Sequence, residues 1–295
     1  MIMKNEAKVL RRCLDSVRGL VKEIIICDTG STDDSIKIAE AYAAKIVKRP
    51  WDDDFAAPRN LAMSYASGDW ILILDPDEVL KTSDHAAVRS LTRRTDAVAF
   101  QMTTRNYTHA KNEPTYRSLG KGTDPTGKYT GYVPSTKTRF VKNGLNIVFE
   151  GCYHELLDWN ILRRKMSSKI TDIPIHHWNH EFSQASVKAK GDMYLRLAYK
   201  KVKQMPNFGQ AWWELAVAQA IQGIRAGAAS SLAKAFTLGF GGANEYFTMS
   251  RILRMIGKKS KGSYAFEKGV CKLFPALTHI DMKQKQLSTL VEGLL

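Results

Sequence analysis

The segment EIIICDTGSTDDSIKIAEAYAAKIVKR (residues 23–49) sets the fold class of this 295-residue chain. It opens with an apolar run that ends at Asp28, which is typical of a buried strand, and passes through Gly30 into a stretch that predicts a helix. AKIVKR (44–49) then predicts a second strand. A strand, a helix and a strand in this order indicate parallel strands joined by a crossover helix.

The same alternation continues on both sides of this segment. Apolar residues from Val9 to Leu20 recur at helical spacing, and MIM before them reads as the end of a first strand that is short or truncated. Residues 51–69 predict a loop and a helix, and DWILILD (69–75) predicts a strand whose continuous apolar run suits the centre of a parallel sheet. We therefore expect an open α/β sheet, which binds its ligands beyond the carboxyl ends of its strands.

The middle of the chain is less regular. DAVAFQMTTRNY (96–107) predicts a strand, and residues 117–137 are rich in Gly, Thr and Lys, which predicts a loop of about 20 residues. Residues 138–157 predict two short strands that end in a helix start, and SSKITDIPIHHWNHE (167–181) predicts a further strand with histidines at its end.

After Ser183 the sequence predicts helices alone, which places the domains at 1–185 and 186–295. Proline, tryptophan and Leu-Ala placements in this second part resemble tetratricopeptide repeats (TPR), although the spacing is imperfect. The expected helices cover residues 184–205, 209–223, 228–240, 245–257 and 262–274.

The composition excludes several classes of protein. No run of about 18 apolar residues is present, and charges from Lys4 onward interrupt the position of a signal-peptide core. We expect a cytoplasmic protein, with peripheral contact at the inner face of the membrane as an alternative. The cysteines form no CxxC pair, which argues against a disulfide framework or a zinc site.

The net charge of +15 is unevenly distributed along the chain. Residues 1–80 carry 11 Lys and Arg against 14 Asp and Glu, residues 81–205 carry 22 against 10, and residues 206–295 carry 11 against 5. Such a basic field favours a polyanionic partner, which would be nucleic acid, an anionic membrane surface or an anionic glycan. The alternative is a solvated basic face with no partner.

Three carboxylates follow the strand at 69–75, in the sequence Asp75-Pro76-Asp77-Glu78. Like charges so close repel, so a positive group is expected among them. A DxD pair at a strand end suits Mg²⁺ or Mn²⁺ shared with a diphosphate, with Glu78 supporting from behind. A solvated acidic turn is the alternative. Asp28 lies at the same sheet edge, where it is a candidate acceptor for a uracil N3–H or a ribose hydroxyl.

Three motifs carry a family resemblance: KNEAKVLRRCLDSV, EIIICDTGSTDDS and PRNLAMSYASGDWILILDPDE. In this order they resemble the nucleotide-sugar half of family-2 glycosyltransferases, which have the GT-A fold, a Rossmann-like mixed sheet. The chain is similar to the branch with lipopolysaccharide core glucosyltransferases and peptide S-glycosyltransferases that carry a TPR-like helical tail. TRFVKNGLNIVFEGCYHELL continues the likeness, whereas residues 103–137 match no motif.

The resemblance implies roles for individual residues. Asp28 would bind the base, Arg59 would contact the nucleotide or diphosphate, Asp75 would touch the ribose or donor sugar, and Asp77 would ligate the metal. Asn5 and Glu6 would line the nucleoside pocket.

Glu155 is the candidate general base, because it stands where many family members have an acidic pair, with His154 as an alternative helper. An ordinary acid at a helix start is the competing interpretation of Glu155.

His176, His177 and His180 follow one another closely, but nothing near them in sequence completes a tetrahedral zinc site. His177 is the candidate to complete the shell of the catalytic metal or to contact the diphosphate. A structural or exposed histidine is an equal alternative.

The resemblance implies an inverting, metal-dependent glycosyltransferase that uses a nucleotide-diphosphate sugar, with UDP as the expected nucleotide. The acceptor stays open among anionic glycan or lipopolysaccharide, protein and a modified DNA base. The helical tail would form an acceptor wall, recruit a protein partner or dimerise. A non-catalytic scaffold built on the same module is the second interpretation. A nucleotidyltransferase is disfavoured, since KNEAKVL has no glycine for a phosphate loop.

Overall fold

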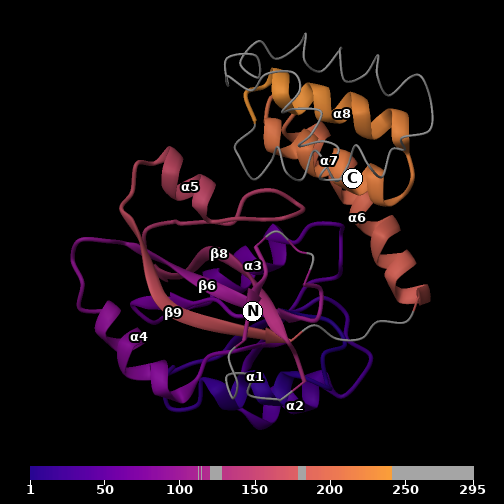
Figure 1. Ribbon diagram of the computed structural model, residues 1–295. Helices are drawn as coiled ribbons and strands as arrows, with labels where there is room; N and C mark the ends of the chain where they lie inside the picture. The colour runs from indigo at the N-terminus through magenta and orange to yellow at the C-terminus, as the bar shows by residue number, and fades with distance from the viewer. Residues whose placement is uncertain (112, 114, 120–127, 179–183, 241–295) are drawn as a thin grey trace. The chain divides into compact units, whose positions relative to one another are not determined.

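The computed structural model describes residues 1–111, 113, 115–119, 128–178 and 184–240 (Figure 1). The chain divides into two compact units, Met1–Glu181 and Phe182–Leu295. The first unit is a mixed α/β structure, and the described part of the second is helical. The expected helices at 245–257 and 262–274 lie outside the described residues, as does His180.

A small parallel sheet opens the first unit, with β2 (Ile25–Asp28) between β1 (Ile2–Met3) and β3 (Lys45–Lys48). Helices α1 (Leu10–Ser16) and α2 (Ser35–Ala41) follow β1 and β2 and lie side by side (Figure 1). These two helices and this sheet bury a common apolar core that includes Leu10, Leu14 and Ile26. The strand and helix alternation expected from the sequence is confirmed here.

The larger sheet has the order β4-β8-β6-β9-β5, with β7 (Arg117–Ser118) added beside β8. Its long strands are β6 (Ala99–Thr108), β8 (Gly131–Lys142) and β9 (Ser168–Trp178), and β6 pairs antiparallel with β8 and parallel with β9. The outer strands are β4 (Trp70–Leu72) and β5 (Glu78–Val79), and helices α3 (Ala56–Ser64) and α4 (His85–Leu91), with the short 3₁₀ helix η1 (Thr82–Asp84), complete this part of the chain.

The placement expected for the strand at 69–75 is wrong. β4 is short and pairs antiparallel with β8 at the end of the larger sheet, rather than lying at the centre of a parallel one. Its residues are half-buried and pack on two sides, Trp70 and Leu72 against the core that contains Phe140 and Ile71 against the core that contains Val141. Trp70 also stacks on Phe140 of β8, with ring centroids 4.9 Å apart. The run is continuously apolar because both faces of the strand pack against apolar residues.

Two further expectations need correction. Residues 117–137 are not all loop, since β7 and the first half of β8 fall inside them and residues 120–127 lie outside the described part. Residues 138–157 contain the end of β8 but no second strand, only an isolated bridge between Glu150 and Leu156. Helix α5 begins at Asp158, so Glu155 lies in the turn before it.

The described part of the second unit consists of α6 (Gln184–Gln204), α7 (Gly209–Ile221) and α8 (Arg225–Thr237). α7 and α8 are joined by three residues and share a core built on Trp213, Leu232 and Phe236. Lys201 of α6 and Glu214 of α7 form a buried ion pair of 2.6 Å. No helix in the described ranges of the chain is both long and apolar enough to span a membrane.

Candidate functional site

The acidic segment after β4 is a tight turn that leads into β5. The Glu78 amide donates to the Asp75 carbonyl at 3.0 Å, and the Glu78 carboxylate accepts from the Asp75 amide at 2.9 Å. Pro76 lies within this turn, where its ring fixes one backbone dihedral. The turn points Glu78 inward, with 3% of its surface exposed, and leaves Asp77 partly accessible.

Arg139 neutralises the inner side of the segment. It extends from β8, is 4% exposed, and forms an ion pair with Glu78 and a longer contact of 3.5 Å to Asp75. Burial raises the pKa of Glu78 despite the neighbouring guanidinium. A buried carboxylate without such a partner would be strongly destabilising, so Arg139 allows the acidic turn to pack against the sheet.

Arg59 joins Asp75 to Glu155. Its Nη2 lies 2.7 Å from Asp75 Oδ1, and its Nε lies 2.5 Å from Glu155 Oε1. Burial alone would lower the pKa of Arg59, but the charges of Asp75 and Glu155 outweigh burial and raise it. Burial would raise the pKa of Asp75, yet Arg59 and Arg139 hold it well below its usual range. Arg59 and Asp75 are therefore charged at neutral pH.

Two guanidinium nitrogens in this cluster keep donor capacity. Arg59 Nη1 and Arg139 Nε are buried and have no hydrogen-bond partner. A buried donor without an acceptor costs free energy, so a ligand oxygen that reached it would gain a strong interaction.

The side chains of Asp77 and His177 are in contact, although 100 residues separate them in sequence. His177 Nε2 lies 3.1 Å from Asp77 Oδ2, because β5 pairs with β9 and brings Glu78 opposite His177. The other ring nitrogen, Nδ1, lies 2.8 Å from Asn106 Oδ1. Burial would lower the pKa of His177, but the hydrogen bond to Asp77 outweighs it and raises this pKa. The structure thus brings the two predicted metal-ligating residues together.

His176, which precedes His177, and His154, which precedes Glu155, lie in different environments. His176 is fully buried, with Nδ1 2.6 Å from the Tyr107 hydroxyl, and burial lowers its pKa to about 4. It is a neutral core residue. His154 has a positive φ of 47° and stacks on Tyr153, with ring centroids 3.9 Å apart.

The turn after β2 is held from two sides. Asp28 is 3% exposed, and its carboxylate accepts from the backbone amides of Gly30 and Ser31 at 3.1 and 3.2 Å. Asn5 Oδ1 accepts from the amides of Thr32 and Asp33 at 2.7 and 3.3 Å. Asp28 and Asn5, both predicted binding residues, therefore fix the shape of the turn after β2.

Glu6 joins the same loop through its backbone. Its amide donates to the Ser35 hydroxyl at 2.7 Å, at the first residue of α2. Of the predicted site residues, Asn5, Glu6 and Asp28 lie together at the turn after β2. Arg59, Asp75, Glu155, Asp77 and His177 form linked contacts at the acidic turn.

Arg139 and Asn106 were not predicted from the sequence. The repulsion among three neighbouring carboxylates was a signal for a cation, but it was assigned wholly to a metal ion. The segment TRFVKNG carries the family resemblance, but the resemblance implies no role for its arginine. Nothing in the sequence around Asn106 marks it, since its partner lies 71 residues away.

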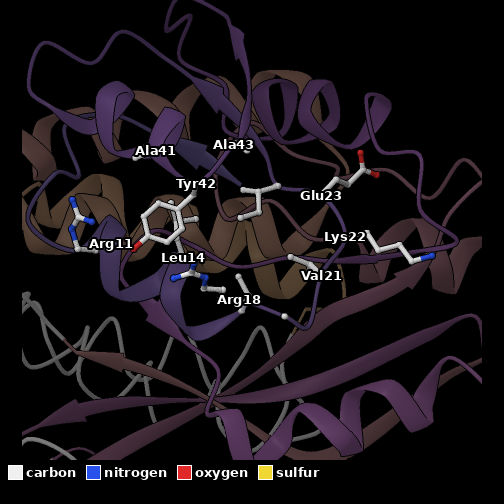
Figure 2. Close-up of a pocket in the computed structure, with 12 residues that line it drawn as sticks. Arg11, Leu14, Arg18, Val21, Lys22, Glu23, Ala41, Tyr42 and Ala43 are labelled. Atoms are coloured by element: carbon white, nitrogen blue, oxygen red, sulfur yellow. The ribbon is translucent and has the colours of Figure 1, made fainter.

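Among the described residues, no three His, Cys, Asp or Glu side chains are grouped so that they could hold a metal ion. Asp77 and His177, the two predicted metal-ligating residues, are in contact but have no third such residue beside them in the described part of the chain. A separate cavity of about 490 Å³ lies against α1 and α2, lined by Arg11, Arg18, Lys22 and Tyr42 among others (Figure 2). None of the site residues lines it.

Comparison with known proteins decides the family. Residues 1–164, more than half of the chain, match the family described as Glycosyl transferase family 2. The chain belongs to glycosyltransferase family 2. The mixed sheet of the first unit is accordingly the GT-A domain that the resemblance implied, and the expected fold class is confirmed for the α/β part and the helical region after it.

Relatives of this family-2 chain include a TPR repeat-containing protein of Synechococcus elongatus, 38% identical over 163 residues, which are 55% of this chain and 35% of that protein. The SPbeta prophage-derived glycosyltransferase SunS of Bacillus subtilis is 23% identical over 209 residues, 70% of this chain and 45% of that protein. The chain therefore spans less than half the length of these two relatives.

Among solved structures, S. aureus TarS in complex with UDP-GlcNAc is similar at 12% identity and a TM-score of 0.48, covering 86% of this chain and 82% of that one.

Proposed function

We propose that this chain is an inverting glycosyltransferase that moves a sugar from a UDP-sugar to an acceptor with the help of a divalent metal ion. The observation that carries the proposal is the approach of Asp77 to His177 at 3.1 Å, beside the ion pair of Arg59 with Asp75. Family membership supplies the reaction class. The site offers a separate group for each task in that reaction.

Asp77 and His177 would hold the metal. Both are accessible, with 28% and 22% of their side chains exposed, and an oxygen with an imidazole nitrogen suits Mn²⁺ or Mg²⁺. Two protein ligands leave positions for water and phosphate oxygens, as is usual when such ions bind nucleotides. When bound, the ion would neutralise the negative charge that develops on the leaving diphosphate.

The donor would be held by groups on both sides of the acidic turn. Arg59 Nη1 has an unused N–H for a phosphate or sugar oxygen. Lys137, on β8 two residues before Arg139, is a further cation whose charge acts on Asp75. Asp28 lies at the carboxyl end of β2, and its Oδ1, which accepts from the Ser31 amide, has a second lone pair that would accept a uracil N3–H.

Glu155 is the proposed general base. Its ion pair with Arg59 holds it 2.5 Å from the same guanidinium that binds Asp75, which ties the base to the donor side of the site. Glu155 would take the proton of the acceptor nucleophile while that atom bonds to the anomeric carbon. The bond from this carbon to the diphosphate oxygen breaks on the opposite face, so the configuration inverts.

For the acceptor we propose an anionic molecule. The supporting observation is the excess of Lys and Arg over Asp and Glu in residues 81–205, 22 against 10. We assign the helical region a TPR-like role in recruiting the acceptor, a protein partner or a second copy. The support is a helix pair, α7 and α8, with a short connection and a shared core.

A thermal-shift panel tests the function. UDP, GDP, UDP-glucose and UDP-N-acetylglucosamine would each be added with Mn²⁺ or with EDTA to the wild type, Asp77→Asn and Asp96→Asn. Asp96 is a matched control, since it is an exposed carboxylate paired with Arg94. We expect Mn²⁺-dependent stabilisation by UDP compounds in the wild type and the control, and its loss in Asp77→Asn. No stabilisation by any nucleotide would favour the scaffold interpretation, and stabilisation by GDP alone would overturn the choice of UDP.

A further inference from the structure

Asn106 has a fixed orientation on β6. Its Nδ2 lies 2.9 Å from the Val133 carbonyl oxygen, 3.1 Å from Ser135 Oγ and 3.5 Å from the Thr104 carbonyl oxygen. Carbonyl oxygens only accept hydrogen bonds, so the atom facing them must be the amide nitrogen. The amide oxygen of Asn106 therefore faces His177.

This orientation determines which nitrogen of His177 carries a proton. Asn106 Oδ1 can only accept, and it lies 2.8 Å from His177 Nδ1. A bare Nδ1 would place two lone pairs against each other at that distance. Nδ1 must therefore donate, and in the neutral ring Nε2 is then the nitrogen with a free lone pair.

Nε2 also faces an acceptor, Asp77 Oδ2 at 3.1 Å, so a protonated ring donates from both nitrogens when no cation is present. A cation that binds between Asp77 and His177 must take the place of the Nε2 proton. If the remaining proton lay on Nε2, neither the imidazole lone pair nor that carboxylate oxygen would be available, whereas a proton held on Nδ1 leaves both for the cation.

We propose that Asn106 is a positioning residue that holds His177 in the Nδ1–H tautomer and so keeps Nε2 available as a ligand beside Asp77. The value of this arrangement rests on the proposed function, because it prepares His177 for the metal. The effect of Asn106 on the tautomer does not require that a metal binds. Removing a hydrogen-bond partner of a ligating histidine typically lowers metal affinity about 10–100-fold.

The first test reads the tautomer without metal. Nitrogen-15 NMR of the imidazole would be recorded in Asp77→Ala and in Asp77→Ala/Asn106→Leu, at a pH where His177 is neutral. Removing Asp77 leaves Asn106 as the group that selects the tautomer. We expect the Nδ1–H form in the first protein and the Nε2–H form, which an unconstrained imidazole prefers, in the second. The Nε2–H form in Asp77→Ala would overturn the proposal, even if the leucine variant failed to fold.

The second test is a Mn²⁺ titration of the full chain by calorimetry. Relative to wild type, Asn106→Leu should bind Mn²⁺ about 10–100-fold more weakly. Ser135→Ala, which removes one Nδ2 acceptor but leaves the contact to His177, is the matched control and should bind as the wild type does.

The two tests distinguish the role of Asn106 from the proposed metal site. Equal Mn²⁺ affinity in wild type and Asn106→Leu would overturn the role of Asn106. If the wild type bound no Mn²⁺, the proposed metal site would fail, and the NMR comparison would still decide whether Asn106 sets the tautomer.

Discussion

Each of the three carboxylates after β4 contacts at least one arginine or histidine side chain. Glu78 is paired with the buried Arg139, and Asp75 lies between Arg139 and Arg59. Asp77 is paired with His177, and its side chain is 28% exposed. Side chains of the protein thus neutralise two carboxylates, which leaves Asp77 as the one suited to share a metal ion with a ligand.

Arg139 should be essential for stability. Arg139→Met leaves Glu78 and Asp75 without their buried cation, so we expect the free energy of unfolding to fall by about 3–5 kcal/mol, measured by urea denaturation. The double variant Glu78→Gln/Arg139→Met should recover part of this loss. Arg94→Met, which breaks an exposed pair with Asp96, should leave the unfolding midpoint unchanged. A loss in Arg139→Met no larger than that in Arg94→Met would contradict the assigned role.

Glu155 should act on the reaction rather than on donor binding. With Glu155→Gln we expect kcat for release of UDP from the stabilising UDP-sugar to fall at least about 10²-fold, because the amide cannot take the acceptor proton. UDP affinity should stay within a few-fold of wild type. Glu40→Gln, a change at an exposed position of α2, is the control. An unchanged kcat would exclude Glu155 as the base.

At the scale of elements, the turn between β2 and α2 depends on Asn5. This residue has a φ of 57° and accepts from two amides of the turn. In the same turn the Ser31 hydroxyl accepts from the Asn5 amide, and Asp33 Oδ1 accepts from the Ser35 amide at 3.0 Å.

We expect Asn5→Ala to lower the free energy of unfolding by about 1–2 kcal/mol, through lost hydrogen bonds and a strained left-handed backbone. Asn5→Gly keeps the backbone conformation accessible and removes only the side chain, so it should cost less. Both variants should weaken UDP binding, measured by calorimetry, because the loop would loosen. If both variants bound UDP with wild-type affinity, this turn would not be part of the nucleoside pocket.

Local pattern predicted the elements whose partners are near in sequence. β2, α2 and β3 follow one another directly, so periodicity and turn residues were sufficient. The prediction for β4 was wrong because its partner, β8, begins 59 residues after the end of β4 and pairs with it antiparallel. A short apolar run does not reveal the direction of its neighbour.

The candidate site was predictable only where a residue belongs to a motif. Asp75, Asp77 and Arg59 were found from motifs, and His177 from its place at a strand end. Arg139 and Asn106 act through pairings across the sheet, and Asn106 meets His177 only because β6 and β9 are parallel neighbours in that register. Such a pairing cannot be read from either strand alone.

At the scale of the whole molecule, charge separates the parts of the chain. The first 80 residues, which carry most of the proposed donor site, have a small acidic excess, whereas the rest accounts for the net charge of +15. This distribution agrees with the proposed cation site in the first 80 residues and with the proposed anionic acceptor.

The proposed anionic acceptor predicts salt-sensitive binding. Affinity for fluorescent polygalacturonate should fall at least about tenfold between about 50 and 200 mM salt, whereas neutral dextran should bind weakly at both. Single-stranded DNA in the same anisotropy assay distinguishes nucleic acid from glycan. Equal binding of dextran and polygalacturonate would contradict an electrostatic basis for acceptor choice.

Metal-dependent nucleotide binding at the acidic turn is tested most directly by calorimetric titration of UDP into the wild type with Mn²⁺, into the wild type with EDTA, and into Asp77→Asn with Mn²⁺. We expect binding in the first experiment and at least about tenfold weaker binding in the other two, because Asp77 and His177 would hold the ion that the diphosphate shares. Equal UDP affinity in all three would contradict a metal-dependent nucleotide-sugar site at this turn.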